Sequence, residues 1–363
     1  MDQSGERVKK ILIAPLDWGL GHATRCIPII GLLIQKGCKV FIAASGKTEK
    51  LLRTEFPTAE FIHLKGYNIR YPAKMGAFTL KIIFQIPKIL RAVRHERRWL
   101  NKLINEKKAD IVISDNRFGL YHPGAVSIII THQLMIRTGL GKWADLFIQH
   151  LNYRYIRRFT HCWVPDFENP NNNLAGILSH APQLPNNASY IGGLSRFETG
   201  NFELKYNALL VLSGPEPQRT EWEEMILKQL SESDEKVLVI RGLPGENTVA
   251  PSFNNTETVN HLNARRMNEA FLQSEFIISR SGYTTIMDII KLRKKAILIP
   301  TPGQTEQEYL ASYLMSKKIC YSVPQKKFSF QEVLANARQF PYVQPEFNME
   351  QYIATVSALL DTL

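Results

Sequence analysis

Short runs of β-branched and other apolar residues alternate along the chain with longer stretches in which apolar residues recur every three or four positions. This alternation predicts strands separated by amphipathic helices. In the first half, strands are expected at Val8–Ala14, Lys39–Ala44, Ala59–Leu64, Ala109–Ser114, Ala125–Ile130 and His161–Pro165, and a helix at Ala23–Gln35. In the second half, strands are expected at Ala208–Leu212, Lys236–Ile240, Thr256–Val259, Phe276–Ile278 and Ala296–Pro300, and helices near Glu221–Leu230, Arg266–Gln273, Tyr283–Lys291 and Glu306–Ser316.

Strands that alternate with helices form parallel sheets that are covered on both faces. The expected fold class is therefore α/β, with two Rossmann-like, doubly wound domains. The segment Tyr190–Phe197 contains two glycines, follows a Pro/Asn-rich loop, and is the expected link. This places the N-terminal domain at residues 1–195 and the C-terminal domain at 196–363. The last predicted helix, 348–363, is expected to cross back to the first domain.

The composition suits two packed domains, because 44% of the 363 residues are hydrophobic. No run reaches the ~18–20 continuous apolar residues of a membrane span, and the first residues lack a signal-peptide core. The four cysteines (Cys26, Cys38, Cys162 and Cys320) have neither metal-site nor redox-pair spacing. They indicate free thiols in a reducing compartment, and a cytoplasmic protein is predicted.

The positive charge is concentrated in the first half. Residues 1–197 hold 28 Lys and Arg against 13 Asp and Glu, a net charge of +15, whereas the remainder has a net charge of −3. Residues 78–105 mix apolar and basic side chains as helices on anionic membranes do. An ordinary domain helix with a basic outer face has the same pattern, so both interpretations stand. We expect a peripheral contact with the inner membrane surface. No nucleic-acid partner is expected, because no aromatic-basic RNA motif is present.

A glycine-bearing turn follows the first predicted strand and reads Gly19-Leu20-Gly21-His22. Thr24 stands where a dinucleotide fingerprint requires Gly or Ala, and no acidic residue ends the next strand, so a nicotinamide enzyme is excluded. His22 falls at the carboxyl end of a strand, where open α/β sheets bind their ligands. A neutral imidazole there can accept a hydroxyl proton. The alternative interpretation of His22 is a helix-capping residue.

Polar loops also follow three predicted strands of the second half. Backbone N–H groups and small polar residues at a helix start suit a diphosphate, and amides and carboxylates suit sugar hydroxyls. Arg219 is a candidate to offset charge on a leaving diphosphate. The candidate residues of the three loops are Ser213, Gly214 and Arg219; Arg280, Ser281, Gly282, Thr284 and Asp288; and Gln304, Gln307 and Glu308.

Several other chemistries are not supported by the sequence. There is no Asp-x-Asp motif of the kind that bridges a diphosphate through a metal, and no His/Cys/Glu cluster with metal-ligand spacing. No Gly-x-Ser-x-Gly nucleophile elbow is present. No metal or other cofactor is therefore expected.

In these motifs the chain resembles the GT-B glycosyltransferases related to the bacterial peptidoglycan N-acetylglucosaminyltransferase, and those with a Gly-x-Gly-His-x-x-Arg start. The resemblance spans essentially the whole chain. It implies two Rossmann-like domains that face a cleft, with the donor on the second and the acceptor on the first. It assigns Ser281 and Gly282 to the diphosphate, Asp288 to the ribose and Gln307 to the sugar. His261 and Leu262 fall near the loop that contacts the base. His22 becomes the candidate base, with Gly19 and Gly21 lining the cleft.

The chain also departs from that family. Its glycine run before the histidine is shorter, and Leu310 replaces an asparagine that helps to recognise the sugar. The segments around Asp115 and His132 are peculiar to the subgroup with the Gly-x-Gly-His-x-x-Arg start. Both side chains are expected to face the cleft, Asp115 in a catalytic role.

The function expected is transfer of a sugar, such as an N-acetylhexosamine, from a UDP-sugar to a hydroxyl of a lipid-linked or cell-envelope glycan. An inverting displacement is implied by the resemblance. Two alternatives remain. One is a nucleotide-sugar hydrolase, because a related group shares the Arg25-Cys26 pair. The other is a non-catalytic membrane or nucleic-acid binder on the same scaffold.

Overall fold

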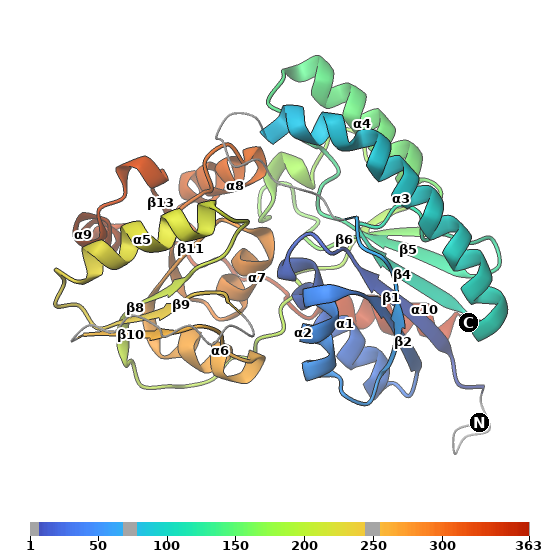
Figure 1. Cartoon of the computed structure of the whole chain (residues 1–363), viewed down its shortest axis with the longest axis horizontal. Coiled ribbons are helices and arrows are strands. Elements are labelled where there is room, and N and C mark those ends of the chain that lie inside the picture. The colour runs from blue at the N-terminus through green and yellow to red at the C-terminus, as the bar shows by residue number, and fades with distance from the viewer. Residues whose placement is uncertain (1–6, 68–77, 244–254, 363) are drawn as a thin grey trace. The chain divides into compact units, whose positions relative to one another are not determined.

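The computed structural model describes residues 7–67, 78–243 and 255–362. These residues form two compact units. The first contains the chain up to Ser195 together with the segment that starts at Phe347, and the second contains Arg196–Glu346. Each unit is built on its own parallel sheet (Figure 1).

The sheet of the first unit has seven strands in the order β3-β2-β1-β4-β5-β6-β7, all parallel. Nearly every residue of the central strands is buried, as expected for a sheet covered on both faces. The strands are β1 (Lys10–Pro15), β2 (Lys39–Ala44), β3 (Glu60–His63), β4 (Ile111–Asp115), β5 (Val126–Ile130), β6 (His161–Val164) and β7 (Ala188–Tyr190).

Helices cover this sheet. The long helix α3 buries Leu100, Leu103 and Ile104 against alternate side chains of β1, β2 and β4. These strand residues share one face of the sheet because alternate residues of a strand point to opposite faces. Elsewhere in the unit, α1 contacts the C-terminal helix α10. The helices of the unit are α1 (Leu20–Gln35), α2 (Gly46–Glu55), α3 (Phe78–Lys107), α4 (Lys142–Ile156), the short η1 (Gly176–Leu178) and α10 (Gln351–Asp361).

The C-terminal segment is fixed to the first unit by close contacts. Phe347 stacks on Phe167 with ring centroids 4.2 Å apart. Gly193 packs so closely against Met349 that an added Cβ would lie 2.3 Å from the Met349 Cε, so a larger residue would require the Met349 side chain to move. Lys9 donates to the Leu360 carbonyl at the end of α10.

The second unit has a six-stranded parallel sheet in the order β10-β9-β8-β11-β12-β13. Its core gathers apolar side chains of these strands around Trp222 of α5 and Phe330 of α9. The strands are β8 (Tyr206–Val211), β9 (Val237–Ile240), β10 (Thr256–Val259), β11 (Ser274–Ser279), β12 (Lys295–Leu298) and β13 (Tyr321–Ser322). The helices are α5 (Gln218–Leu230), α6 (Ala264–Leu272), α7 (Tyr283–Lys291), α8 (Thr305–Ser316), η2 (Gln325–Lys327) and α9 (Phe330–Gln339).

The predicted α/β class with two parallel sheets is confirmed, and the differences lie at short or polar elements. Strand β7 was missed because it is short and largely exposed, and β13 has only two residues. Helices α2, α4 and α9 were also missed. The predicted start of α6 at Arg266 was two residues late, because the Asn263 side chain caps the helix by accepting from the Arg266 N–H at 2.9 Å.

Candidate active site

The candidate catalytic residues of the first unit come together at the carboxyl edge of its sheet. Pro15, the last residue of β1, pairs with Asp115, the last residue of β4, and Asp115 pairs with Ile130 of β5. His22 lies in the first turn of α1, directly after β1, and His132 follows β5. The parallel register therefore places residues from three strand ends at one edge of the sheet.

Arg25, which the sequence argument used only as part of a motif, lies at the centre of this group. Its Nε donates to Asp115 Oδ2 at 2.8 Å, its Nη2 also donates to Asp115, and its Nη1 lies 3.2 Å from the Nδ1 of His132. Asp115 is fully buried and Arg25 is 2% exposed. The guanidinium therefore neutralises the carboxylate and links His132 to it.

Asp115 is ionised despite its burial. Burial alone would raise its pKa, but the charges of Arg25 and His22 and their hydrogen bonds hold the pKa at about 2. Next to it, burial and the neighbouring Asp115 raise the pKa of the Cys26 thiol well above its usual value. Cys26 is therefore a neutral thiol at physiological pH, with its Sγ 3.8 Å from the Asp115 Oδ2.

His22 combines a buried partner with an accessible ring. Its Nδ1 lies 3.2 Å from the Asp115 Oδ2 and 2.9 Å from the Nη2 of Arg25, and 17% of its side chain is exposed. Burial lowers the pKa of His22, with Asp115 opposing and Arg25 adding to the shift. The ring is thus neutral near pH 7. Nδ1 accepts from the Arg25 Nη2 in one tautomer and donates to Asp115 in the other, and in the second tautomer Nε2 is left to accept a proton.

A second buried ion pair supports the Asp115 turn, and sequence reasoning missed it. Arg117 is completely buried and donates to Glu96 of α3 at 2.8 Å, while the Tyr67 hydroxyl donates to the same carboxylate at 2.9 Å. The only signal in the sequence is an acidic residue inside a strongly basic helix. Glu96 thereby anchors α3 to the turn after β4.

The donor loops predicted for the second unit also share one edge. Val211 of β8 pairs with Ser279 of β11, which pairs with Leu298 of β12, so the loops after these three strands are neighbours. Ser213 and Gly214 are exposed, with Gly214 at φ 120, and the glycine Gly282 is the N-cap of α7. Gly282 itself has no side chain to cap that helix N-terminus.

Several predicted donor residues are engaged within their own loops. Ser281 is buried and donates to the Gln307 carbonyl at 2.8 Å. The Gln307 side chain accepts from the Thr301 N–H at 2.9 Å and donates to Gln304 at 2.7 Å, and Glu308 accepts from the Gly303 N–H. These contacts shape the loop between β12 and α8.

The remaining predicted positions occupy different surroundings. Asp288 is buried one turn into α7, and Thr284 is half-buried in its first turn. His261 and Leu262 follow β10, an edge strand of this sheet, and are half-buried. Burial, followed by the charge of Arg196, lowers the pKa of His261. Leu310 is fully buried in α8.

Arg219 differs from its expected role as an available cation. Its Nε donates to Glu216 at 2.5 Å and its Nη1 donates to Glu223 at 2.9 Å, and the residue is 7% exposed. Two carboxylates therefore compensate this guanidinium, which leaves it little net charge to offer a diphosphate.

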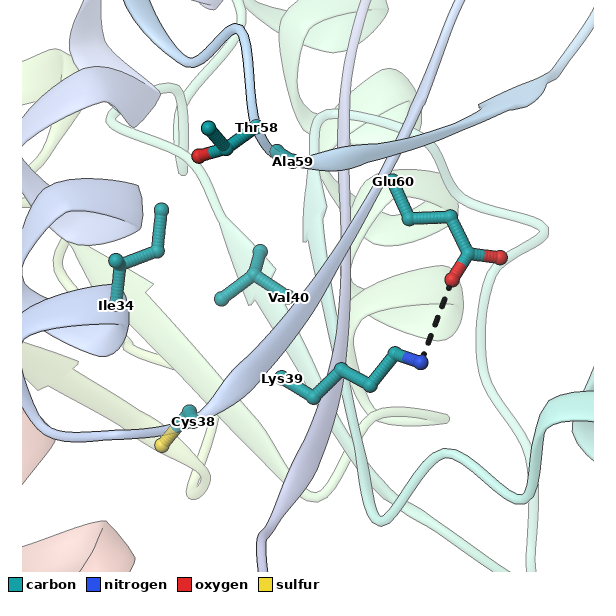
Figure 2. A pocket seen from close by; sticks show the side chains of 7 residues that line it. All are labelled: Ile34, Cys38, Lys39, Val40, Thr58, Ala59 and Glu60. Carbon is teal, nitrogen blue, oxygen red and sulfur yellow. Dashed lines mark ion pairs between the residues drawn. The ribbon is translucent and has the colours of Figure 1, made fainter.

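A hollow of about 340 Å³ in the first unit lies away from these residues (Figure 2). It is lined by the start of β2 and the start of β3, hence by the amino edge of the sheet, whereas open α/β sheets bind ligands at the carboxyl edge. Its two charged side chains, Lys39 and Glu60, form an ion pair of 3.5 Å.

In the part of the chain that the structure describes, no group of three or more His, Cys, Asp or Glu side chains could hold a metal ion. Over the same residues, no helix is long and apolar enough to cross a membrane.

Comparisons with known proteins identify a domain family in the second half of the chain and similar folds over the whole chain. Residues 214–354 match the glycosyltransferase family 28 C-terminal domain. MurG of Acinetobacter baumannii is 16% identical with a TM-score of 0.55, and 98% of this chain and 100% of that chain are covered. The glycotransferase of kitacinnamycin is 13% identical with a TM-score of 0.64, over 98% and 96% of the two chains.

A third similar structure is the spinosyn rhamnosyltransferase SpnG in complex with thymidine diphosphate. It is 12% identical with a TM-score of 0.61, and the match covers 97% of this chain and 100% of that chain. No curated protein sequence matches the chain. The structural matches establish the GT-B type of two-domain fold, and the family match covers the unit with the donor loops. The chain is therefore a glycosyltransferase whose residues 214–354 match the family 28 C-terminal domain.

Proposed function

We propose that this glycosyltransferase moves a sugar from a UDP-sugar to a hydroxyl of a lipid-linked or cell-envelope glycan, by inverting displacement and without a metal. The observation that carries the proposal is the set of three polar loops at the carboxyl edge of the second sheet, within the family 28 match. The similar structures MurG and SpnG support a glycosyltransferase, and the thymidine diphosphate bound to SpnG supports a nucleotide-sugar donor.

In this mechanism the first unit supplies the base. Nε2 of His22 removes the proton of the acceptor hydroxyl while Nδ1–H donates to Asp115. The ionised Asp115 stabilises the imidazolium that forms, and Arg25 keeps the carboxylate ionised and in place. The acceptor oxygen then attacks the anomeric carbon and the bond to the diphosphate breaks.

The second unit binds the donor. The departing diphosphate is received at the N-terminus of α7, where the helix dipole and the main-chain N–H groups of the Ser281–Gly282 turn favour negative charge. Asp288 is assigned to the ribose hydroxyls, Gln307 to the sugar, and the main chain at His261 and Leu262 to the base. Gln307 would exchange one of its loop contacts for a sugar hydroxyl.

We also propose that the first unit contacts an anionic membrane, where a lipid-linked acceptor is found. The strongest support comes from α4 rather than from the apolar part of the 78–105 helix. Trp143 is 88% exposed and Phe147 64%, beside Leu140 and Leu146 at 53% and 51%. Exposed basic side chains accompany them on α4 and α3: Lys142, Arg154, Arg157, Lys88, Arg91, Arg94 and Arg98. Exposed aromatic side chains on a unit with many exposed Lys and Arg side chains suit an anionic lipid surface.

Donor binding is tested by calorimetry with UDP, GDP and TDP, on the wild type, Asp288→Ala and the control Glu224→Ala. Glu224 is an exposed carboxylate on α5. Selective UDP binding that Asp288→Ala weakens and Glu224→Ala preserves supports the donor site. Absence of binding by every nucleotide would remove the proposal and leave a non-catalytic binder.

Transfer is separated from hydrolysis by following sugar release from the donor without an acceptor. Rapid release that depends on His22 would identify a hydrolase, the alternative suggested by the Arg25-Cys26 pair.

Membrane contact is tested by co-sedimentation with anionic and zwitterionic vesicles. Binding to anionic vesicles that is equal in the wild type and in Trp143→Ser/Phe147→Ser would exclude α4 as the contact.

A further inference from the structure

Arg280 is a buried cation that the mechanism above does not use. It directly follows Ser279, the last residue of β11, and precedes the Ser281–Gly282 turn at the start of α7. Its side chain does not project into solvent, because the residue is only 2% exposed. The first residue of the expected diphosphate turn therefore places its guanidinium inside the second unit.

The partners of this guanidinium are all uncharged. Nη1 donates to the carbonyls of Ile299 and Pro300 at 3.2 and 3.3 Å, and the guanidinium carbon lies 4.8 Å from the centre of the Trp222 ring. Nε and Nη2 are buried without a hydrogen-bond partner. Main-chain oxygens and an aromatic face stabilise a cation only in part.

The other deeply buried arginines of the described chain are paired differently. Arg25 has Asp115, Arg117 has Glu96, and Arg219 has Glu216 and Glu223. Among the residues that the structure describes, no carboxylate forms an ion pair with Arg280. In the described part of the second unit, Arg280 is thus the one deeply buried arginine whose charge no carboxylate compensates.

An uncompensated buried cation is costly. Burial lowers the pKa of Arg280 to about 10, so the group is still charged at neutral pH. A positive potential consequently persists next to the turn. It adds to the potential of the α7 N-terminus, whose N-cap residue, Gly282, has no side chain.

We propose that Arg280 is a positioning residue that makes this turn selective for the diphosphate of the donor, through its charge rather than through contact. This inference rests on the proposed donor site. An anion bound at the turn supplies the counter-charge that the protein lacks, whereas an uncharged nucleoside gains nothing from Arg280. Because negative charge on the diphosphate grows as the sugar leaves, the same potential favours the departing group. The bonds from Nη1 also fix the main chain that leads into the loop carrying Gln304 and Gln307.

The test compares UDP with uridine, which differ in the charged diphosphate. Affinities are measured by calorimetry for the wild type, Arg280→Gln, Arg280→Lys and the control Arg265→Gln. Arg265 is a cation on α6 whose side chain is 89% exposed and whose Nε donates to Glu269 at 3.1 Å. We expect Arg280→Gln to lower UDP affinity by roughly 10- to 100-fold, because a unit charge several ångströms away in a partly buried site is worth that much. Uridine affinity should change less than about twofold. Arg265→Gln should leave both affinities unchanged.

Arg280→Lys distinguishes charge from shape, because lysine keeps the charge and lacks the forked guanidinium. It should preserve most of the ratio between UDP and uridine affinities. Equal losses of UDP and uridine in Arg280→Gln, or a ratio lost in a folded Arg280→Lys, would overturn the inference. Thermal unfolding of each variant monitors folding. If Arg280→Gln does not fold, a ratio lost in a folded Arg280→Lys still overturns the inference. A wild type that binds no nucleotide would instead contradict the proposed donor site.

Discussion

Replacing Asp115 by asparagine tests the central pair of the first unit. The substitution keeps the shape of the side chain but removes the charge that Arg25 neutralises and the acceptor that orients His22. Arg25, at 2% exposure, would then be a buried cation without its carboxylate. Removing the partner of a buried charge destabilises the folded state far more than removing one partner of a surface ion pair.

The magnitude follows from two arguments. The fall in the pKa of Asp115 from 3.8 to about 2 corresponds to about 2 kcal/mol of folding free energy. Breaking a buried pair and leaving one partner behind costs about 3–5 kcal/mol. We therefore expect Asp115→Asn to lower the free energy of unfolding by about 3–5 kcal/mol. At about 2–4 °C per kcal/mol, Tm falls by roughly 6–20 °C.

The pH dependence gives the same substitution a second signature. Because the folded pKa of Asp115 lies below the unfolded value, its contribution to stability is present above pH 3.8 and is lost as the pH falls through about 2. Asp115→Asn should lose this part of the acid dependence. Urea unfolding at several pH values measures it.

The matched control is Glu60→Gln. Glu60 also contacts two lysines, Lys107 at 2.6 Å and Lys39 at 3.5 Å, but its side chain is 40% exposed. Exposed ion pairs contribute about 0–1 kcal/mol. Should Asp115→Asn be no less stable than Glu60→Gln, with unchanged acid dependence, the account of a tightly coupled Arg25–Asp115 pair would be refuted.

Three further predictions concern activity and the donor loop. His22→Ala should lower kcat by about 10²- to 10⁴-fold with little change in donor affinity, measured by steady-state transfer and calorimetry, and an unchanged kcat would exclude His22 as base. Burial lowers the pKa of His22, and the neutral ring is the active form, so kcat/KM should rise with pH with a midpoint below 6.5 and be flat near pH 7. A wild-type midpoint above 6.5 would contradict this assignment. Gln307→Leu removes the acceptor of the Thr301 N–H, so we expect a loss of about 1–3 kcal/mol of stability in chemical unfolding together with weaker donor-sugar binding, and wild-type values of both would contradict the role of this loop.

The sequence alone determined the alternation of the main strands and helices and the edge at which the polar loops lie. Hydrophobic periodicity is a local property, and a chain of alternating strands and helices has few topologies other than parallel sheets. In parallel sheets all strands end at the same edge, so the loops at Ser213, Arg280 and Gln304 could be grouped without coordinates. The family match to residues 214–354 agrees with that grouping for the second unit.

Only the tertiary structure decided which charges are paired. From the sequence, Arg219 was the candidate to offset the diphosphate charge and Arg280 was one of the donor-loop residues. In the structure Glu216 and Glu223 compensate Arg219, and nothing in the described chain compensates Arg280. In the same way, Arg25 became the centre of the first site through Asp115, 90 residues away. Ion pairing depends on side-chain distances of a few ångströms between residues remote in sequence, and hydrophobic periodicity carries no information about these distances.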